Sequence, residues 1–467
     1  MEPLYDPETL EEWDDEYLWH PFTPHSVYRD EDPLTVVGGD GHYLIDAEGR
    51  RYLDGVSSIW CNPFGHRREE IDEAIRDQLD RIAHSTLLGH ANDRAVELAK
   101  RLVEVAPEDS SKAFFSDDGS TAMEIALKMA IQYWQQAEGG RESQRTTFLS
   151  FSNQYNGDTV GAVSTGGIDL FHSRFEPLLF DVIRALSPRF YERPEGQSRE
   201  VAVQRFVDAF DDLVEEYADQ LAAVVMEPGM QGAGGMVKFP EGFLGHAREV
   251  TERHGILLIV DEVAMGMGRT GSMFYCQQED VQPDLMAVAK MLTGGYTPLA
   301  ATLTTDEIYE AFLGPPEEGR TFFHGHTYTG NAIGAAAAVA TLDIFEEENV
   351  LEEMQSTIDH LAEGLESLSS NPWVGDIRQL GLAAGVELTP TPGERESFES
   401  ADRVGQKVCR AAREKGVFLR PLEDVIVLMP PLSISRDEID DLLEAVEYGI
   451  DEVAPEYGES SSGRVVE

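Results

Sequence analysis

The chain has 467 residues, which is more than one hydrophobic core usually serves, so two packed domains are expected. Its 87 aspartate and glutamate residues outnumber 36 lysine and arginine residues and give a formal net charge of -51, which argues against nucleic acid as a partner. Hydrophobic residues make up 42% of the chain, but the most apolar runs are far shorter than the roughly 20 residues of a membrane span, so no membrane-spanning segment is expected.

The N-terminal segment contains no basic region followed by an apolar stretch, so no secretion signal is expected and the protein is predicted to be cytoplasmic. Apolar residues in 34-LTVVGGDGHYLIDAEGRRYLD-54 predict paired strands. Residues 1–60 are expected to pack with a small domain that the C-terminal part of the chain forms.

The middle of the chain alternates apolar runs with amphipathic stretches, a pattern typical of a mainly parallel sheet with helices on both faces. The predicted strands are 112–116, 146–151, 222–228, 256–263 and 285–290, followed by a strand and helix within 301–312 and a long helix within 331–350. We therefore expect an α/β domain over residues 61–335 and a smaller α+β domain over residues 336–467.

A polar turn, 116-SDDGS-120, follows the first of these strands and begins a helix that is apolar on nearly all sides. The free N–H groups and the positive end of the helix dipole can bind a phosphate there. Gly119 would allow close approach and Ser120 would donate its hydroxyl. An ordinary helix cap is the alternative for the same Gly-Ser pair.

Three polar residues follow the predicted strands at similar intervals. Asp261 ends the run 256-ILLIVDEV-263, 34 residues after Glu227 and 29 residues before Lys290. One βαβ step takes roughly 30 residues, so all three side chains are expected at the carboxyl edge of the sheet, where open parallel sheets bind ligands. A structural ion pair between Asp261 and an arginine, for example Arg269, is the alternative.

Lys290 is one of seven lysines and lies in 285-LMAVAKMLTGGYTPLA-300, between an apolar strand and a Gly-Gly turn. Apolar surroundings favour the uncharged form of an amine, which can attack an aldehyde. A lysine whose ammonium group reaches solvent is the alternative.

Together these motifs resemble class III aminotransferases. The resemblance rests on 19-WHPFT-23, 57-SSIW-60, 116-SDDGSTAMEIALKMAIQYW-134, 155-YNGDTVGAVS-164, 226-MEPGMQGAGGM-236, 261-DEVAMGMGRTG-271, 289-AKMLTGGY-296, 324-HGHTYTGN-331 and 417-VFLRPL-422. WHPFT, IALKMAIQYW and HGHTYTGN are typical of the subgroup that converts 8-amino-7-oxononanoate to 7,8-diaminononanoate in biotin biosynthesis. The resemblance implies a fold type I transferase, a pyridoxal 5′-phosphate cofactor and a homodimer.

The resemblance also implies roles for individual residues. Lys290 would hold the cofactor covalently and carry protons, and Asp261 would contact the pyridine nitrogen and keep it protonated. The residues expected to complete the cofactor site are Gly119 and Ser120 at the phosphate, Tyr155 on the ring, and Glu227, His326 and Thr327, with Thr327 reaching across the dimer interface.

Substrate is expected to contact Trp60, Gly325 and Arg420 in addition to Tyr155 and Lys290. The guanidinium group of Arg420 would bind the far carboxylate of the keto substrate, because it is planar and always charged.

Four residues near the expected substrate pocket depart from the commoner pattern of the subgroup. Asn156 stands where histidine is common, Phe22 where tyrosine is common, Ile59 where a second tryptophan is common, and His326 where proline is common. The resemblance implies either S-adenosylmethionine or lysine as the amino donor. The reduced aromatic lining favours lysine, since adenine and a sulfonium group bind well to aromatic faces.

Two other functions fit parts of the sequence. Another class III ω-aminotransferase, acting on ornithine, 4-aminobutyrate or a related diamine, or a semialdehyde aminomutase, would share the fold and the cofactor. A regulator that keeps the fold without catalysis would have no need of Lys290, Asp261, Gly119 and Ser120, all of which are present.

The three cysteines, Cys61, Cys276 and Cys409, have spacings that suit neither a disulfide framework nor a metal cluster, so no metal site is expected. Acidic residues are spread over most of the chain instead of forming a tail. Self-repulsion on this scale weakens a compact fold, so the sequence predicts a halophilic protein that is screened by concentrated salt.

We expect the melting temperature of the protein to rise as potassium chloride is added to dilute buffer, because the Debye length falls from about 10 Å at 0.1 M to about 3 Å at 1 M. Differential scanning fluorimetry measures this, with sucrose of equal osmolality as the control for preferential exclusion. A melting temperature that is the same in dilute buffer and molar salt would contradict the screening argument.

Overall fold

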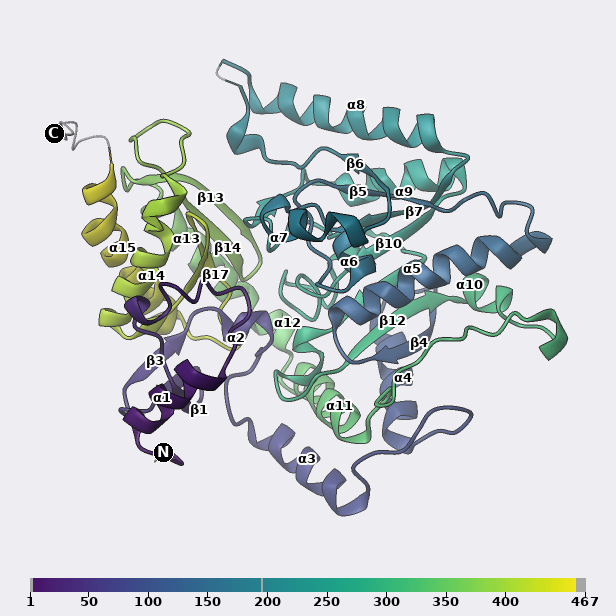
Figure 1. Cartoon of the computed structure of the whole chain (residues 1–467), viewed down its shortest axis with the longest axis horizontal. Helices are drawn as coiled ribbons and strands as arrows, with labels where there is room; N and C mark the ends of the chain where they lie inside the picture. Colours follow the sequence, from purple (N-terminus) through teal and green to yellow (C-terminus); the bar gives the residue numbers. More distant parts are fainter. Residues whose placement is uncertain (1–2, 195, 459–467) are drawn as a thin grey trace. The chain divides into compact units, whose positions relative to one another are not determined.

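A computed structural model describes residues 3–194 and 196–458 of the chain, which form two compact units (Figure 1). The larger unit comprises Glu70–Ile358 and Arg378–Gly385. The smaller unit comprises the residues up to Glu69, the segment Asp359–Ile377 and the residues from Val386 onward. In the described part of the chain, no helix combines the length and the apolar character needed to cross a membrane.

The larger unit is built on a seven-stranded sheet with the order β4-β12-β11-β10-β7-β5-β6. Its strands are β4 (Ser110–Ser116), β5 (Thr147–Phe151), β6 (Val182–Ala185), β7 (Leu221–Met226), β10 (Leu257–Asp261), β11 (Leu285–Val288) and β12 (Ala300–Thr305). Strand β12 is antiparallel to both of its neighbours, and the pairs from β11 to β6 are parallel. The predicted mainly parallel sheet is therefore confirmed, and β6 is the strand that the sequence patterns did not indicate.

Helices cover both faces of this sheet. On one face, α5 (Gly119–Gln136) and α10 (Asp306–Ala311) pack on Phe148, Val225, Ile259 and Ala287 in a single buried cluster. On the other face, phenylalanines of α8 (Arg199–Tyr217) and α9 (Phe243–His254) stack around Phe151. Phe148 and Phe151 lie on opposite faces because successive side chains of a strand alternate in direction. Both faces are thus buried, as the apolar strands require.

The larger unit contains further helices, a two-stranded pair and several 3-10 turns. They are α3 (Glu69–Arg81), α4 (Asp93–Val105), α6 (Val160–Thr165), α7 (Asp169–His172), α11 (Ala332–Glu347), α12 (Val350–Glu353), the pair β8 (Met230–Gln231) and β9 (Val237–Lys238), and the 3-10 turns η2 (Ala137–Gly139), η3 (Ser173–Leu178), η4 (Phe190–Glu192), η5 (Tyr275–Glu279), η6 (Lys290–Thr293) and η7 (Pro316–Glu318).

The smaller unit joins the two ends of the described chain. Strands β1 (Val36–Asp40), β2 (Tyr43–Asp46) and β3 (Arg51–Asp54) form a sheet with β15 (Val417–Phe418), which runs parallel to β3. A second sheet has the order β13-β14-β17-β16, with β13 (Val374–Leu380), β14 (Ala383–Leu388), β17 (Val425–Leu428) and β16 (Arg420–Leu422). The helices are α1 (Pro7–Tyr17), α2 (Ser57–Trp60), α13 (Gln355–Leu368), α14 (Val404–Ala412) and α15 (Arg436–Tyr457), and the 3-10 turns are η1 (Arg29–Glu31), η8 (Ser400–Asp402) and η9 (Arg413–Lys415).

The boundaries between the compact units differ from the domain boundaries expected from the sequence, which were 60/61 and 335/336. In the structure the chain passes from one unit to the other after Glu69 and after Ile358, and the segment Arg378–Gly385 belongs to the larger unit. Helix α11 therefore lies wholly in the larger unit, where its alanine-rich surface is buried against α4 and η6. A helix with small side chains on all sides packs closely against neighbours on several sides.

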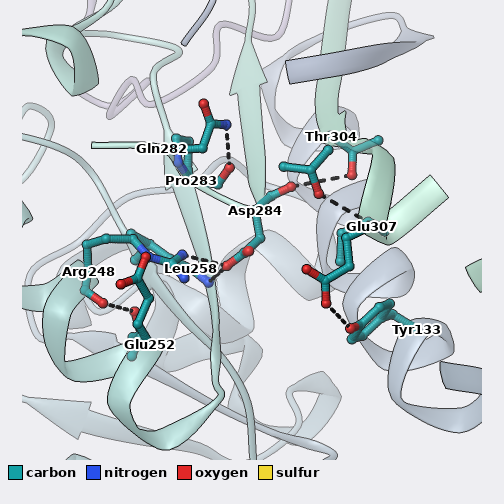
Figure 2. Close-up of polar contacts among 12 residues, drawn as sticks. Tyr133, Arg248, Glu252, Leu258, Gln282, Pro283, Asp284, Thr304 and Glu307 are labelled. Atoms are coloured by element: carbon teal, nitrogen blue, oxygen red, sulfur yellow. Dashed lines mark hydrogen bonds and ion pairs between the residues drawn. The ribbon is translucent and has the colours of Figure 1, made fainter. Parts of the chain in front are cut away.

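A partly buried ion pair links α9 to the edge of the sheet at which β10 and β11 begin (Figure 2). The carboxylate of Asp284 accepts hydrogen bonds from Nη1 of Arg248 and from the backbone N–H of Leu258, each at 2.7 Å. Burial raises the pKa of Asp284, and the Arg248 charge lowers it. One carboxylate thus fixes β11 to the second residue of β10 and to α9.

We expect Arg248→Met to lower the free energy of unfolding by about 1–3 kcal/mol, because the substitution leaves the partly buried Asp284 carboxylate without its cation. Urea denaturation followed by circular dichroism measures the change. Arg76→Met is the matched control, since Arg76 is exposed and its pair with Asp72 is a surface pair worth at most about 1 kcal/mol. Equal effects of the two substitutions would show that the Arg248–Asp284 pair contributes no more than a surface pair.

Candidate active site

Glu227, Asp261 and Lys290 follow three neighbouring strands at their carboxyl ends. Val260 pairs with Met226, and Asp261 pairs with Ala287, so the register brings the ends of β7, β10 and β11 side by side. Glu227 is 3% exposed and Asp261 is 5% exposed. The structure therefore brings together the two carboxylates and the lysine that their spacing in the sequence placed at one edge.

Each oxygen of the Asp261 carboxylate accepts one hydrogen bond. Oδ1 accepts from the backbone N–H of Val263 at 3.0 Å, and Oδ2 accepts from Nδ2 of Asn156 at 2.8 Å. Burial raises the pKa of Asp261, whereas these two donors and the Lys290 charge lower it. A carboxylate oxygen can accept two hydrogen bonds, so the side chain retains capacity for a cationic N–H donor.

Glu227 is held by backbone N–H groups. Its Oε1 accepts from Tyr155 at 3.0 Å and its Oε2 accepts from Gly232 at 2.9 Å. Burial and the Asp261 charge raise the pKa of Glu227 to about 8, although the two N–H donors and Lys290 lower it. Burial thus favours the protonated form of Glu227 beside Asp261.

Lys290 begins the 3-10 turn η6 directly after β11. Its φ of 48° lies in the left-handed region, which costs about 1–3 kcal/mol for a residue other than glycine. Its side chain is half-buried, and its charge acts on both Asp261 and Glu227. Strain of this kind is typical of residues that a fold holds in place for function.

The start of α5 adjoins the end of β10. A Cβ at Gly119 would lie 2.7 Å from Cγ1 of Val263, so only glycine allows this approach. Asp118 caps the helix by accepting the N–H of Thr121 at 2.9 Å, and the first turn leaves further N–H groups without an intrahelical acceptor. The hydroxyl of Ser116, at the end of β4, is buried without a hydrogen-bond partner among the described residues.

The loop that carries Tyr155 packs on this helix start. Oγ of Ser120 accepts the N–H of Asp158 at 3.1 Å, and Asp158 in turn accepts the hydroxyl of Tyr155 at 2.7 Å. Gly157 adopts a φ of 116°, and a Cβ there would overlap with Oγ of Ser120. Tyr155 and Ser120, which the resemblance implicated separately, are therefore held by one another through Asp158.

The predicted residues of the 324-HGHTYTGN-331 segment are only partly in contact with this helix start. Nδ1 of His326 lies 2.8 Å from a carboxylate oxygen of Asp117, which immediately precedes the N-cap of α5. Gly325 and Thr327 are exposed.

Trp60 and Arg420 belong to the smaller unit and are described within it. Trp60 ends α2 with a φ of 69° and is buried, and Arg420 is exposed at the start of β16. Their expected contacts with substrate stay predictions.

The sequence patterns did not predict the roles of two residues of the site. Asn156 was noted only as a departure near the substrate pocket, whereas it bonds Asp261, and Gln154, which bonds Asn156, was not indicated at all. The available signal was position, because both residues follow the carboxyl end of β5 at the edge of the sheet that carries Glu227 and Asp261.

This set of groups fits pyridoxal 5′-phosphate. The free N–H groups at the start of α5 and the unpaired Ser116 hydroxyl suit a phosphate, and Asp261 suits a protonated ring nitrogen. An amine that approaches the two carboxyl groups from the neighbouring strand suits an aldehyde.

Known proteins match nearly the whole chain. The family model "Aminotransferase class-III" matches residues 26–450. The adenosylmethionine-8-amino-7-oxononanoate aminotransferase of Geobacter sulfurreducens is 51% identical over 449 residues, which cover 96% of this chain and 98% of that protein. The crystal structure of the protein of that name from Methanocaldococcus jannaschii has a TM-score of 0.91 and 44% identity, covering 96% of this chain and 100% of that one. A PLP-bound amine transaminase from an uncultivated Pseudomonas species has a TM-score of 0.88 and 35% identity, covering 94% and 99%.

We expect Gly157→Ala to weaken both the fold and the binding of pyridoxal 5′-phosphate, because the new Cβ would displace the Tyr155–Asp158 loop from Ser120. The backbone conformation alone would cost about 1–3 kcal/mol. Thermal denaturation and fluorescence titration with the cofactor measure the two effects. Gly242→Ala is the control, since Gly242 has a φ of 77° but nothing within 4 Å of its would-be Cβ. Unchanged cofactor affinity in Gly157→Ala would contradict the contact between this loop and the cofactor site.

Proposed function

The chain belongs to the class III aminotransferases, and from this premise we propose that it transfers an amino group to 8-amino-7-oxononanoate and forms 7,8-diaminononanoate in biotin biosynthesis. The observation that carries the proposal is the pair of buried carboxyl groups of Glu227 and Asp261 with the half-buried Lys290 beside the start of α5. Class III aminotransferases bind pyridoxal 5′-phosphate, and the site fits that cofactor.

S-adenosylmethionine is the donor in this proposal, in place of the lysine that the pocket departures favoured. The relatives that are 51% and 44% identical over nearly their full lengths both carry the name of an adenosylmethionine enzyme. Four single substitutions in an expected pocket are weaker support than this near full-length similarity.

The ω-aminotransferase alternative has less support. The fold does not separate the two readings, since the amine transaminase structure has a TM-score of 0.88 against 0.91 for the Methanocaldococcus jannaschii protein. Sequence identity does separate them, at 35% against 44%.

When bound, the cofactor supplies an aldehyde that binds amino groups and a ring that accepts the electrons left by deprotonation at carbon. Lys290 would hold the cofactor through Nζ and, with its amine free, would move a proton to and from the substrate carbon. Asp261 would keep the ring nitrogen protonated, because a charged carboxylate favours the cationic form of its partner.

The other residues of the larger unit bind and orient. Gly119 and Ser120 would hold the phosphate at the start of α5. Tyr155, whose hydroxyl donates to Asp158, would hold the ring. Glu227 orients the backbone N–H groups of Tyr155 and Gly232 and limits the negative charge near Asp261 while it is protonated.

Two copies of the chain are proposed to form the working enzyme, with Thr327 completing the phosphate site of the partner and His326 and Gly325 lying beside it. Support comes from exposed apolar side chains next to that segment in sequence or space, namely Leu88, Phe323 and Tyr328, which are 71%, 84% and 60% exposed. Exposed apolar side chains that gather in this way mark interaction surfaces.

Trp60 and Arg420 are proposed to bind 8-amino-7-oxononanoate, with Arg420 at its carboxylate. The cytoplasm is the proposed compartment, and the buried thiols of Cys276 and Cys409, which carry no disulfide, fit its reducing conditions.

We expect the purified enzyme to convert 8-amino-7-oxononanoate to 7,8-diaminononanoate with S-adenosylmethionine, and Lys290→Ala to lose multiple turnover while still binding cofactor without a covalent link. Mass spectrometry of the product and the visible spectrum of the protein measure the two effects. Lys112→Ala is the control, because Lys112 is exposed and pairs with Asp306.

Three results would contradict the proposal. Turnover in Lys290→Ala equal to that of the unsubstituted enzyme would remove Lys290 from the reaction. Activity with ornithine or 4-aminobutyrate but none with 8-amino-7-oxononanoate would favour the ω-aminotransferase alternative. Product formation with lysine and none with S-adenosylmethionine would show that lysine is the amino donor.

A further inference from the structure

Three uncharged side chains, those of Asn156, Gln154 and Thr165, form a hydrogen-bonded network that contacts Asp261. Nδ2 of Asn156 donates to Oδ2 of Asp261 at 2.8 Å, and Oδ1 of Asn156 accepts from Nε2 of Gln154 at 2.8 Å. Oδ1 of Asn156 also accepts from the hydroxyl of Thr165 at 3.2 Å. These three residues and Asp261 are all buried. The network therefore lies out of reach of solvent and ends on the carboxylate.

Gln154 and Asp261 fix which way the Asn156 amide faces. A reversed amide would point its N–H groups at the N–H of Gln154 and would set its carbonyl oxygen against the Asp261 carboxylate. Asn156 is thus held as a donor towards Asp261.

The Gln154 amide is also held in one orientation. Its Nε2 donates both to Oδ1 of Asn156 at 2.8 Å and to the backbone carbonyl of Val225, at the end of β7, at 3.2 Å. Its own Oε1 is buried and has no hydrogen-bond partner among the described residues. A buried acceptor without a partner destabilises the fold. The fold thus keeps Gln154 as a donor to Asn156 at the expense of its own carbonyl.

No member of this network titrates. The titratable groups that act on Asp261 or are affected by it are Glu227 on the end of β7, Glu262 and Lys290 after β10 and β11, and Tyr155 on the loop. Asn156 presents the same N–H donor at every pH at which these groups change charge.

We propose that Asn156 is a positioning residue that Gln154 orients, and that it keeps the Asp261 carboxylate charged and turned for the cofactor nitrogen without a charge change of its own. This inference rests on the proposed function, because that function gives Asp261 its partner. A histidine at position 156 would also donate an N–H, but its charge changes between about pH 5 and 8.

The test compares Asn156→Leu, Asn156→His and Gln154→Leu in the holoenzyme. For Asn156→Leu we expect kcat to fall by about 10- to 100-fold and the dissociation constant of pyridoxal 5′-phosphate to rise, since a hydrogen bond to a charged group is lost. The KM for 8-amino-7-oxononanoate should change little. The pH dependence of the visible absorption of the bound cofactor should shift, which a purely structural role would not cause.

Asn156→His should keep most of the activity above neutral pH. Below neutral pH it should lose more activity than the unsubstituted enzyme does. Gln154→Leu should have a smaller effect than Asn156→Leu and no further effect in the double variant, because Gln154 acts through Asn156. Gln78→Leu is the control for the removal of a buried amide, since Gln78 bonds the carbonyl of Ile82 at the end of its own helix.

Unchanged kcat and spectrum in Asn156→Leu, or a lower melting temperature alone as in Gln78→Leu, would overturn the inference. If Asn156→Leu does not fold, an unchanged spectrum in Gln154→Leu together with no added acid limb in Asn156→His overturns it equally. Asp261→Asn, measured in parallel, separates a failure of the proposed role of Asp261 from a failure of the proposed role of Asn156. Full turnover in Asp261→Asn contradicts the proposed role of Asp261 itself, whereas loss there with no loss in Asn156→Leu contradicts only the role of Asn156.

Discussion

The burial of the Asp261 carboxylate at the carboxyl edge of the sheet constrains the rest of the larger unit. A charged group with 5% exposure is stable only where donors and a cation compensate for the lost water. Val263 and Asn156 supply the donors, and Lys290 supplies a charge of opposite sign. The neighbouring Glu227 can share this space because its raised pKa of about 8 leaves it mostly protonated at neutral pH.

Rigid elements hold this arrangement from several sides. The parallel register of β7, β10 and β11 brings the three groups together, and Asp284 ties β10, β11 and α9 at the opposite edge of the sheet (Figure 2). Val263 packs against Gly119, so the end of the strand that carries Asp261 also sets the start of α5. The phosphate end and the ring-nitrogen end of the cofactor site are therefore positioned by one strand and its neighbours.

The loop after β5 connects these two ends. Its backbone holds Glu227, its aspartate bonds the hydroxyl of Tyr155, and its asparagine bonds Asp261. Gly157 allows the loop to approach Ser120 at a distance that no side chain at that position would permit. One short segment of sequence thus contacts the groups proposed for phosphate, ring and ring nitrogen.

The sequence by itself determined the parallel α/β sheet, the helix start at Gly119 and the set of Glu227, Asp261 and Lys290, because each depends on local patterns: apolar runs of strand length, a glycine before an apolar helix, and spacings of one βαβ step. Only the tertiary structure decided which neutral side chains support the carboxylate. Gln154 and Asn156 are ordinary polar residues in a loop, and their contacts with Val225 and Asp261 join residues 71 and 105 positions apart. The pairing of β15 with β3 and the changes between compact units at Glu69 and Ile358 likewise depend on contacts between distant segments. Such contacts follow from how the packed elements meet in space, and neither periodicity nor composition encodes them.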